Sequence, residues 1–233
     1  MIKLLINGID TALGAQIADR LGAQYPDLAV IGLGRAKPPG PIGRAEWLSA
    51  ALNGQQILHL LRSEQITTVI HVGFLGIDGP DASREAAVQQ NVLGSMELFG
   101  ACAAAGVQRV VLRSHSWIYG ALPTNPMGIE EHREITRSGL QGVVRDFAEV
   151  EQFVADFAPR HPYLPICSLR CGPLLGADTP LAMYLGQPDP QMIFGFDPIL
   201  QTLHIDDAAA HLWLRPSAIV AGRLTSPPKI RSV

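Results

Sequence analysis

The chain has 233 residues, of which 47% are hydrophobic and 17% are charged, and its formal net charge is -3. This length fits one sizeable α/β domain with a small appendage and is too short for two full domains. The slightly acidic charge excludes the basic surface that nucleic-acid binding needs, and no apolar run approaches the length that spans a bilayer.

Short apolar runs alternate with helical stretches along the chain, which predicts a parallel sheet with crossover helices. The predicted strands are Ile2–Ile6, Leu28–Leu33, Thr68–Val72, Val107–Arg113 and Leu164–Arg170. The first predicted helix lies between the first two strands and has Leu13, Ile17 and Leu21 on one apolar face. The other predicted helices are Gln55–Glu64, Ala82–Ala105, Val144–Phe157 and Asp206–Arg215. The Pro- and Gly-rich segment Arg35–Arg44 reads as a loop. Past Gly172 the regular alternation ends, which predicts a small C-terminal lobe on the substrate side.

The stretch INGIDTALGAQIADRL (Ile6–Leu21) is typical of the first strand-to-helix turn in a dinucleotide-binding domain. Gly8 permits a tight turn, and Gly14 lets the helix pack close to the sheet, so that the open N–H groups of the helix face a pyrophosphate. Thr11 stands where the usual pattern G-x-x-G-x-x-G has its middle glycine. Its side chain would either push the phosphates outward or supply a hydroxyl hydrogen bond. On its own, the motif fits the strand–helix turn of any α/β protein equally well.

The end of the second strand bears on the choice of cofactor. NAD-binding domains usually hold the ribose 2′-hydroxyl with an Asp or Glu at this position. Here the sequence VIGLGRAK places Gly34 there, followed by Arg35. Because an arginine binds a 2′-phosphate in a bidentate manner, a bound dinucleotide is expected to be NADP(H) rather than NAD(H). The alternative is that Arg35 is a solvated loop residue.

Several later stretches resemble the extended short-chain dehydrogenase/reductase family, in its NAD-dependent epimerase/dehydratase branch. They are TTVIHVGF (Thr67–Phe74), NVLGSMELFGACAAAGVQRVVLRSHSWIYG (Asn91–Gly120), LRCGPLLG (Leu169–Gly176) and LQTLHIDDAA (Leu200–Ala209). The second is similar to N-V-x-G-T-x-N-L-L-E-A-A-x-x-A-G-V-x-R-x-V-x-x-S-S-x-x-V-Y-G nearly position by position. The resemblance implies an α/β Rossmann-like fold, a doubly wound parallel sheet over residues 1–170, with a small C-terminal lobe, residues 171–233, packed on it. It also implies a dinucleotide site at Gly8, Thr11, Gly14, Arg35, Gly73, Phe74 and Asn91.

The chemistry of this family needs three side chains: a Tyr acid–base, a Lys four residues on that depresses the pKa of the Tyr, and a Ser or Thr that polarises the reacting oxygen. Placing Glu151 on the family's helical Glu puts the Tyr position at Val143 and the Lys position at Phe147, and neither side chain exchanges a proton. No Tyr elsewhere in the printed sequence has a Lys four residues on. The Ser/Thr position falls on His115, with Ser114 and Ser116 on either side.

Two functions are compatible with this pattern. In the first, the fold binds a dinucleotide at a degenerate site that has lost the ordinary Tyr/Lys hydride chemistry. In the second, the chain is an active NADP(H)-dependent oxidoreductase or epimerase acting on a small carbonyl or sugar-like substrate. His115 would then be the acid–base, because an imidazole titrates near neutral pH. A hydrogen-bonded structural histidine at a strand end is the alternative role for His115.

The remaining candidate residues are interpreted as structural. The family resemblance assigns His71 to shaping a strand end and His204, Asp206 and Asp207 to starting a helix. His132 and the acids around it in Gly128–Gly139 lack metal-site spacing, so no metal is expected. One helix face, which carries Val88, Val92, Met96 and Phe99, resembles the face through which this family dimerises, so a homodimer is one possibility. The periodicity alone indicates only that this face is buried. No signal peptide is recognised, so the protein is expected to be cytoplasmic. Its three cysteines are therefore expected to be reduced; they are Cys102, Cys167 and Cys171.

Overall fold

The computed structural model describes residues 2–51, 53–76, 83–126, 128–135, 138–176, 179–191, 195, 201–220 and 231–232. Within these residues, seven parallel strands form one sheet in the order β3-β2-β1-β4-β5-β6-β9. The strands are β1 (Lys3–Asn7), β2 (Ala29–Gly34), β3 (Glu46–Ser49), β4 (Thr68–His71), β5 (Arg109–His115), β6 (Ile166–Cys171) and β9 (Arg231–Ser232). The main helices are α1 (Ala12–Gln24), α2 (Gly54–Ser63), α3 (Arg84–Val88), α4 (Gly94–Ala105), α5 (Gly142–Phe157) and α7 (Ile205–Val220).

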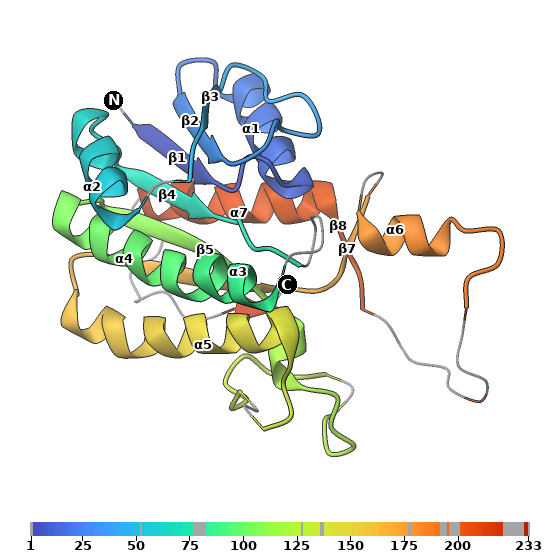
Figure 1. The fold of residues 1–233 in the computed structure, drawn as a ribbon. Helices are drawn as coiled ribbons and strands as arrows, with labels where there is room; N and C mark the ends of the chain where they lie inside the picture. The colour runs from blue at the N-terminus through green and yellow to red at the C-terminus, as the bar shows by residue number, and fades with distance from the viewer. Residues whose placement is uncertain are drawn as a thin grey trace.

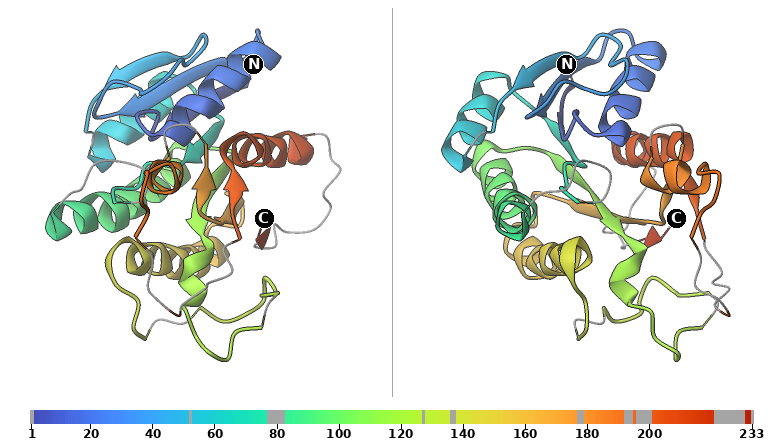
Figure 2. Two further views of the ribbon diagram at one scale, coloured as in Figure 1. Left: turned by 90° about the vertical axis from the view of Figure 1, so that its right-hand side faces the viewer. Right: turned by 45° about the vertical axis from the view of Figure 1, so that its right-hand side comes forward.

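Helices cover both faces of the sheet (Figure 1). The right view of Figure 2 shows α1 and α7 on one side and α2, α4 and α5 on the other. The alternation of side chains along β1 explains this arrangement, because Leu4 and Ile6 belong to the apolar cluster of α1 and α7, whereas Leu5 belongs to that of α2, α4 and α5. The structure confirms the predicted doubly wound Rossmann-like sheet.

The strand order reverses at β1. From β1, the chain adds β2 and β3 on one side and then β4, β5 and β6 on the other. In open α/β sheets, ligands bind outside the carboxyl ends of the strands at such a reversal point. The crevice therefore lies between the ends of β1 and β4, at Gly8 and Gly73.

Before β6, the observed elements differ from the predicted ones in two places. Strand β3 was not predicted, because all four of its residues are exposed and the edge strand carries no buried alternation. The predicted helix Ala82–Ala105 is observed as α3, a π-helical turn η1 (Gln89–Leu93) and α4, with Ala82 outside the described residues. The other predicted strands and helices are confirmed, most of them with ends that shift by one or two residues.

The residues after β6 form two separate parts of the structure, a small two-stranded sheet and helix α7. A two-stranded sheet of β7 (Leu174–Leu175) and β8 (Leu203–His204) lies with the short helix α6 (Pro180–Leu185) beside the main sheet (Figure 1). Helix α7 then returns to α1, where Gln16 Nε2 donates to Asp206 Oδ1 at 2.7 Å and Arg20 Nη1 donates to the Asp206 carbonyl at 2.6 Å. The boundary at residue 170 stays a prediction. In the described part of the chain, no helix is both long and apolar enough to cross a bilayer.

Candidate functional site

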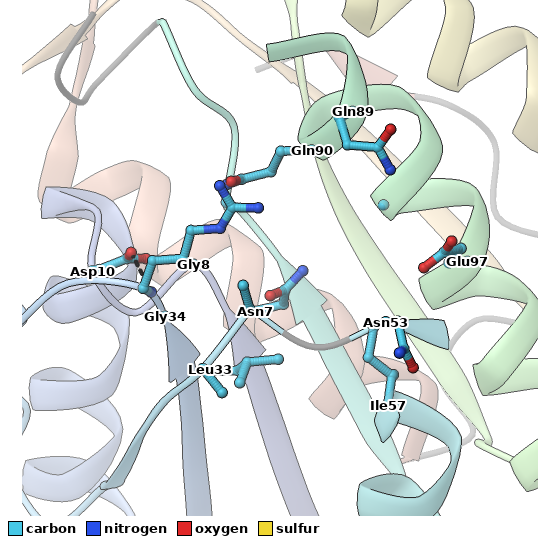
Figure 3. Close-up of a pocket in the computed structure, with 15 residues that line it drawn as sticks. Asn7, Gly8, Asp10, Leu33, Gly34, Asn53, Ile57, Gln89, Gln90 and Glu97 are labelled. Atoms are coloured by element: carbon cyan, nitrogen blue, oxygen red, sulfur yellow. Dashed lines mark hydrogen bonds between the residues drawn. The ribbon is translucent and has the colours of Figure 1, made fainter. Parts of the chain in front are cut away.

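A pocket of about 240 Å³ opens at the reversal point of the sheet. Its walls come from the ends of β1 and β2, the loop after β4, and the helical turn η1 with the start of α4 (Figure 3). Of the predicted cofactor residues, Gly8, Arg35 and Gly73 line this pocket. The pocket therefore lies where the fold places a ligand.

The glycines of the first loop allow a close approach of backbones. Gly8 has a φ of +101°, and a Cβ added to it would lie 2.3 Å from Gly73 Cα. A Cβ added to Gly14 would lie 2.1 Å from the Gly8 carbonyl oxygen. Any side chain at these positions would separate the β1–α1 loop from the β4 loop or from its own helix.

Thr11 is the N-cap of α1. Its Oγ1 accepts the N–H of Gly14 at 3.0 Å and donates to the Gly8 carbonyl at 2.8 Å, and the residue is only 9% exposed. A hydroxyl has a single proton to donate, and here Gly8 receives it. Both sequence expectations for Thr11, crowding of the phosphates and a hydroxyl ligand, stay predictions, but the observed role is to hold the loop against the helix.

The sequence analysis missed Asp10, which lies against the end of β2. Its Oδ2 accepts the backbone N–H groups of Arg35 at 2.8 Å and Ala36 at 3.2 Å. A Cβ added to Gly34 would lie 2.7 Å from Asp10 Cγ. The available signal was an acid inside the glycine loop combined with a glycine where the strand usually ends in an acid.

Asn91 and Phe74, two further predicted cofactor residues, are buried and are not among the residues that line the pocket. The Asn91 side chain is fully buried, its Oδ1 accepts the Leu75 N–H at 2.8 Å, and its Nδ2 donates to the Leu75 carbonyl at 3.1 Å and to Asp146 Oδ2 at 2.9 Å. Asp146, also fully buried, accepts a further bond from Arg84 Nη1 at 2.8 Å. This network ties the loop after β4 to η1 and α5.

The positions predicted for the family's Tyr and Lys carry the apolar side chains of Val143 and Phe147, and their match to the catalytic pair stays a prediction. Val143 lies in the first turn of α5, half-buried. Phe147 is 1% exposed, and its ring centroid lies 4.3 Å from that of Phe74 and 5.9 Å from that of His115. Phe147, at the predicted Lys position, is therefore part of the apolar core.

His115 and its neighbouring serines meet at the end of β5. His115 is 1% exposed, and its Nδ1 accepts the N–H of Trp117 at 3.2 Å. Burial, with the charge of Arg113, lowers the pKa of His115 to about 3, below the neutral range that we assumed for an acid–base. Ser114 is fully buried, and no described residue gives its Oγ a hydrogen bond, whereas Ser116 is half-buried in the 3₁₀ turn η2 (Ser116–Tyr119).

His71 is a structural histidine at the end of β4. Its Nδ1 pairs with Asn7 Nδ2 at 3.1 Å, and its Nε2 pairs with Ser95 Oγ at 2.8 Å. Burial lowers the pKa of His71 to about 4, so the ring is neutral at pH 7. Asn7 also lines the pocket, so this histidine positions one of the pocket walls.

Glu151 lies opposite β6. The carboxylate accepts Arg170 Nε at 3.0 Å on both oxygens, and Arg170 Nη1 donates to the Tyr119 hydroxyl at 2.7 Å. The side chains of Glu151 and Arg170 are 1% and 3% exposed. This buried ion pair joins α5 to the sheet and does not line the pocket.

Val92 and Phe99, two residues of the predicted dimer face, are buried inside the chain at 4% and 0% exposure. Met96 lines a second pocket together with side chains of α5. A homodimer stays a prediction. The described residues contain no group of three or more His, Cys, Asp or Glu side chains arranged to hold a metal ion.

Comparison with known proteins gives a family match over residues 4–214, to the NAD dependent epimerase/dehydratase family. An uncharacterized protein of Mycobacterium tuberculosis is 33% identical over 217 residues, which make up 90% of this chain and 57% of the relative. This chain thus spans little more than half the length of that relative.

Solved structures share the fold. The UDP-Glc/GlcNAc 4-epimerase from Campylobacter jejuni superposes with a TM-score of 0.79 at 17% identity, covering 100% of this chain and 78% of the epimerase. The UDP-glucose 4-epimerase from Bifidobacterium longum, in complex with NAD⁺ and UDP, also has a TM-score of 0.79, at 14% identity, covering 99% of this chain and 77% of the epimerase.

Proposed function

Because the chain belongs to the NAD-dependent epimerase/dehydratase family, we propose that it binds a nicotinamide dinucleotide at the ends of β1 and β2 without the ordinary Tyr/Lys hydride chemistry. The observation that carries this proposal is a contrast between the glycine loop and the segment predicted to hold the catalytic pair. The glycine loop keeps the close contact of Gly8 with Gly73, while Phe147, at the predicted position of the Lys, is buried in the apolar core.

The residues of the pocket fit a dinucleotide. Its walls carry a carboxylate at Asp10, a guanidinium at Arg35, and Gln90, whose Oε1 is buried and accepts no hydrogen bond from any described residue. A buried acceptor without a hydrogen bond lowers the stability of the fold unless a ligand or a water molecule donates to it. A nicotinamide cofactor supplies hydride transfer when bound, and in this chain the glycine loop, Asp10 and Arg35 would hold it. NAD in the Bifidobacterium longum epimerase supports the same class of ligand here.

Two residues of the pocket favour different cofactors. Arg35 is exposed at the pocket and would pair with a 2′-phosphate, which supports the expectation of NADP(H) over NAD(H). Asp10, whose carboxylate accepts the backbone N–H of Arg35 at 2.8 Å, would repel the same phosphate. The choice between the cofactors therefore depends on which of the two side chains meets the ribose.

A second candidate function is an active oxidoreductase or epimerase on a small carbonyl or sugar-like substrate. The unsatisfied Oγ of buried Ser114 supports it, because a hydroxyl without a partner at a strand end is free to bind a reacting oxygen. His115 would have to act as a base from its neutral form, since burial keeps its pKa near 3. UDP bound to the Bifidobacterium longum epimerase points to a nucleotide sugar as the substrate class to try first.

Calorimetry with NAD⁺, NADH, NADP⁺ and NADPH tests the binding, and a hydride-transfer assay with carbonyl compounds and nucleotide sugars tests the chemistry. We expect binding of at least one dinucleotide and no turnover. Absence of binding for all four would refute the proposal. Turnover that disappears in His115→Ala, with the dinucleotide affinity unchanged, would establish the second function instead. His59→Ala, which removes an exposed imidazole of α2, is the matched control for His115→Ala and should behave as the wild type.

A further inference from the structure

We propose that Asp10, in the loop before α1, binds the ribose diol of the adenosine half of the dinucleotide and so selects NAD(H) against NADP(H). This inference rests on the proposed function, because it specifies one subsite of the same pocket. It assigns to the β1–α1 loop a role that dinucleotide-binding domains usually give to an acid at the end of the second strand.

The position of Asp10 supports the assignment. The end of β2 carries no side chain at Gly34, and a Cβ added there would lie 2.7 Å from Asp10 Cγ and 2.8 Å from Asp10 Oδ1. The Asp10 carboxylate thus occupies the space in which a side chain of β2 would begin. Figure 3 shows Asp10 and Gly34 side by side on one wall of the pocket. The glycine and the relocated acid require each other, because a larger residue at position 34 would displace Asp10.

The orientation of the carboxylate is fixed by the backbone. Asp10 Oδ2 accepts the N–H groups of Arg35 and Ala36, at 2.8 and 3.2 Å. In the described part of the chain, no donor bonds to Oδ1, and Asp10 lines the pocket. An ionised carboxylate accepts on both oxygens and donates on neither. Oδ1 is therefore a preorganised acceptor, which matches the two hydroxyl donors of a ribose.

The same charge opposes a 2′-phosphate. A phosphate in place of the 2′-hydroxyl removes one donor and adds negative charge next to a carboxylate that the backbone holds in place. Arg35 offers the compensating positive charge, but its side chain is exposed and would have to be ordered on binding, at a cost in conformational entropy. Asp10 is already ordered, so we infer that its repulsion decides the preference.

The test is calorimetric titration of NAD⁺ and NADP⁺ into the wild-type protein, Asp10→Asn and Asp27→Asn. Asp27 is an exposed acid before β2, so its substitution matches the change of net charge without touching the pocket. We expect the wild type and Asp27→Asn to prefer NAD⁺ by at least about tenfold, the scale of a charged hydrogen bond. Asp10→Asn, which is nearly isosteric, should weaken NAD⁺ by about tenfold and strengthen NADP⁺.

Three outcomes overturn the inference in distinguishable ways. If the wild type prefers NADP⁺, or if Asp10→Asn leaves the ratio of the two affinities unchanged, Asp10 does not select the cofactor, while the proposed function stands. If the wild type binds neither cofactor, the proposed function fails and this inference with it. Arg35→Ala in the Asp10→Asn background should keep the gained NADP⁺ affinity, because the gain comes from the relieved repulsion, and a lost gain would assign the preference to Arg35 and overturn the inference.

Discussion

The fold should lose about 4 kcal/mol of its free energy of unfolding when the pH falls from 7 to 5, because it buries two neutral imidazoles. Burial lowers the pKa of His71 to about 4 and that of His115 to about 3 from an ordinary value of 6.5. At pH 5, the unfolded chain therefore binds two protons that the folded chain does not.

The magnitude follows from linkage. One pKa unit corresponds to about 1.4 kcal/mol, and pH 5 lies about 1.5 units below the ordinary histidine pKa, which gives about 2 kcal/mol for each ring. A depressed pKa in the folded state means that stability is complete above pH 6.5 and declines as the pH falls toward the folded-state values. Since a domain is typically stable by about 5–15 kcal/mol, the loss is large.

Urea denaturation between pH 5 and 7.5 measures this dependence. His71→Gln and His115→Gln should each halve the slope of unfolding free energy against pH, whatever they do to the stability at pH 7. His59→Gln, at an exposed position of α2, should leave the slope unchanged. A flat profile in the wild type, or an unaltered slope in His115→Gln, would mean that His115 takes up its proton within the fold, as a neutral-range acid–base would.

Three further predictions concern the first loop, the buried ion pair and the two positions predicted for the catalytic Tyr and Lys. Thr11→Ala should lower the unfolding free energy by about 1 kcal/mol through loss of the N-cap, measured in urea; lost dinucleotide affinity at unchanged stability would make the hydroxyl a ligand. Glu151→Gln should cost about 3–5 kcal/mol in thermal melts, because Arg170 keeps a buried and unpaired charge; a change under about 1 kcal/mol would contradict this. Val143→Tyr with Phe147→Lys should give no turnover in a carbonyl-reduction assay, because a Lys in the core pays several kcal/mol of desolvation; measurable turnover would show an intact substrate cleft.

Much of the fold was predictable because its signals are local. Apolar runs place the strands, and the glycines of the first loop mark the turn at which the backbones of Gly8 and Gly73 meet. The exposed edge strand β3 has no such pattern, because its position depends on pairing with β2 rather than on burial.

The candidate site was predictable only in part. The sequence indicated that Val143 and Phe147 cannot exchange protons, since this depends on residue type alone. Asp10 was missed because neither segment points to it alone: its signal combines an acid in the first loop with a glycine at position 34, two places far apart in the chain. The low pKa of His115 also depends on burial, which no local pattern around it indicates.

The π-helical turn η1 adds one residue to what would otherwise be a continuous α-helix from Arg84 to Ala105. One extra residue turns the segment before it by about 100° relative to the segment after it. Deleting a residue within Gln89–Leu93 would therefore restore the α-helical register and rotate Arg84 away from the Asp146 carboxylate, which it now neutralises. The length of this segment is thus more constrained than its composition, and natural variants of this chain should tolerate substitutions here more readily than insertions or deletions.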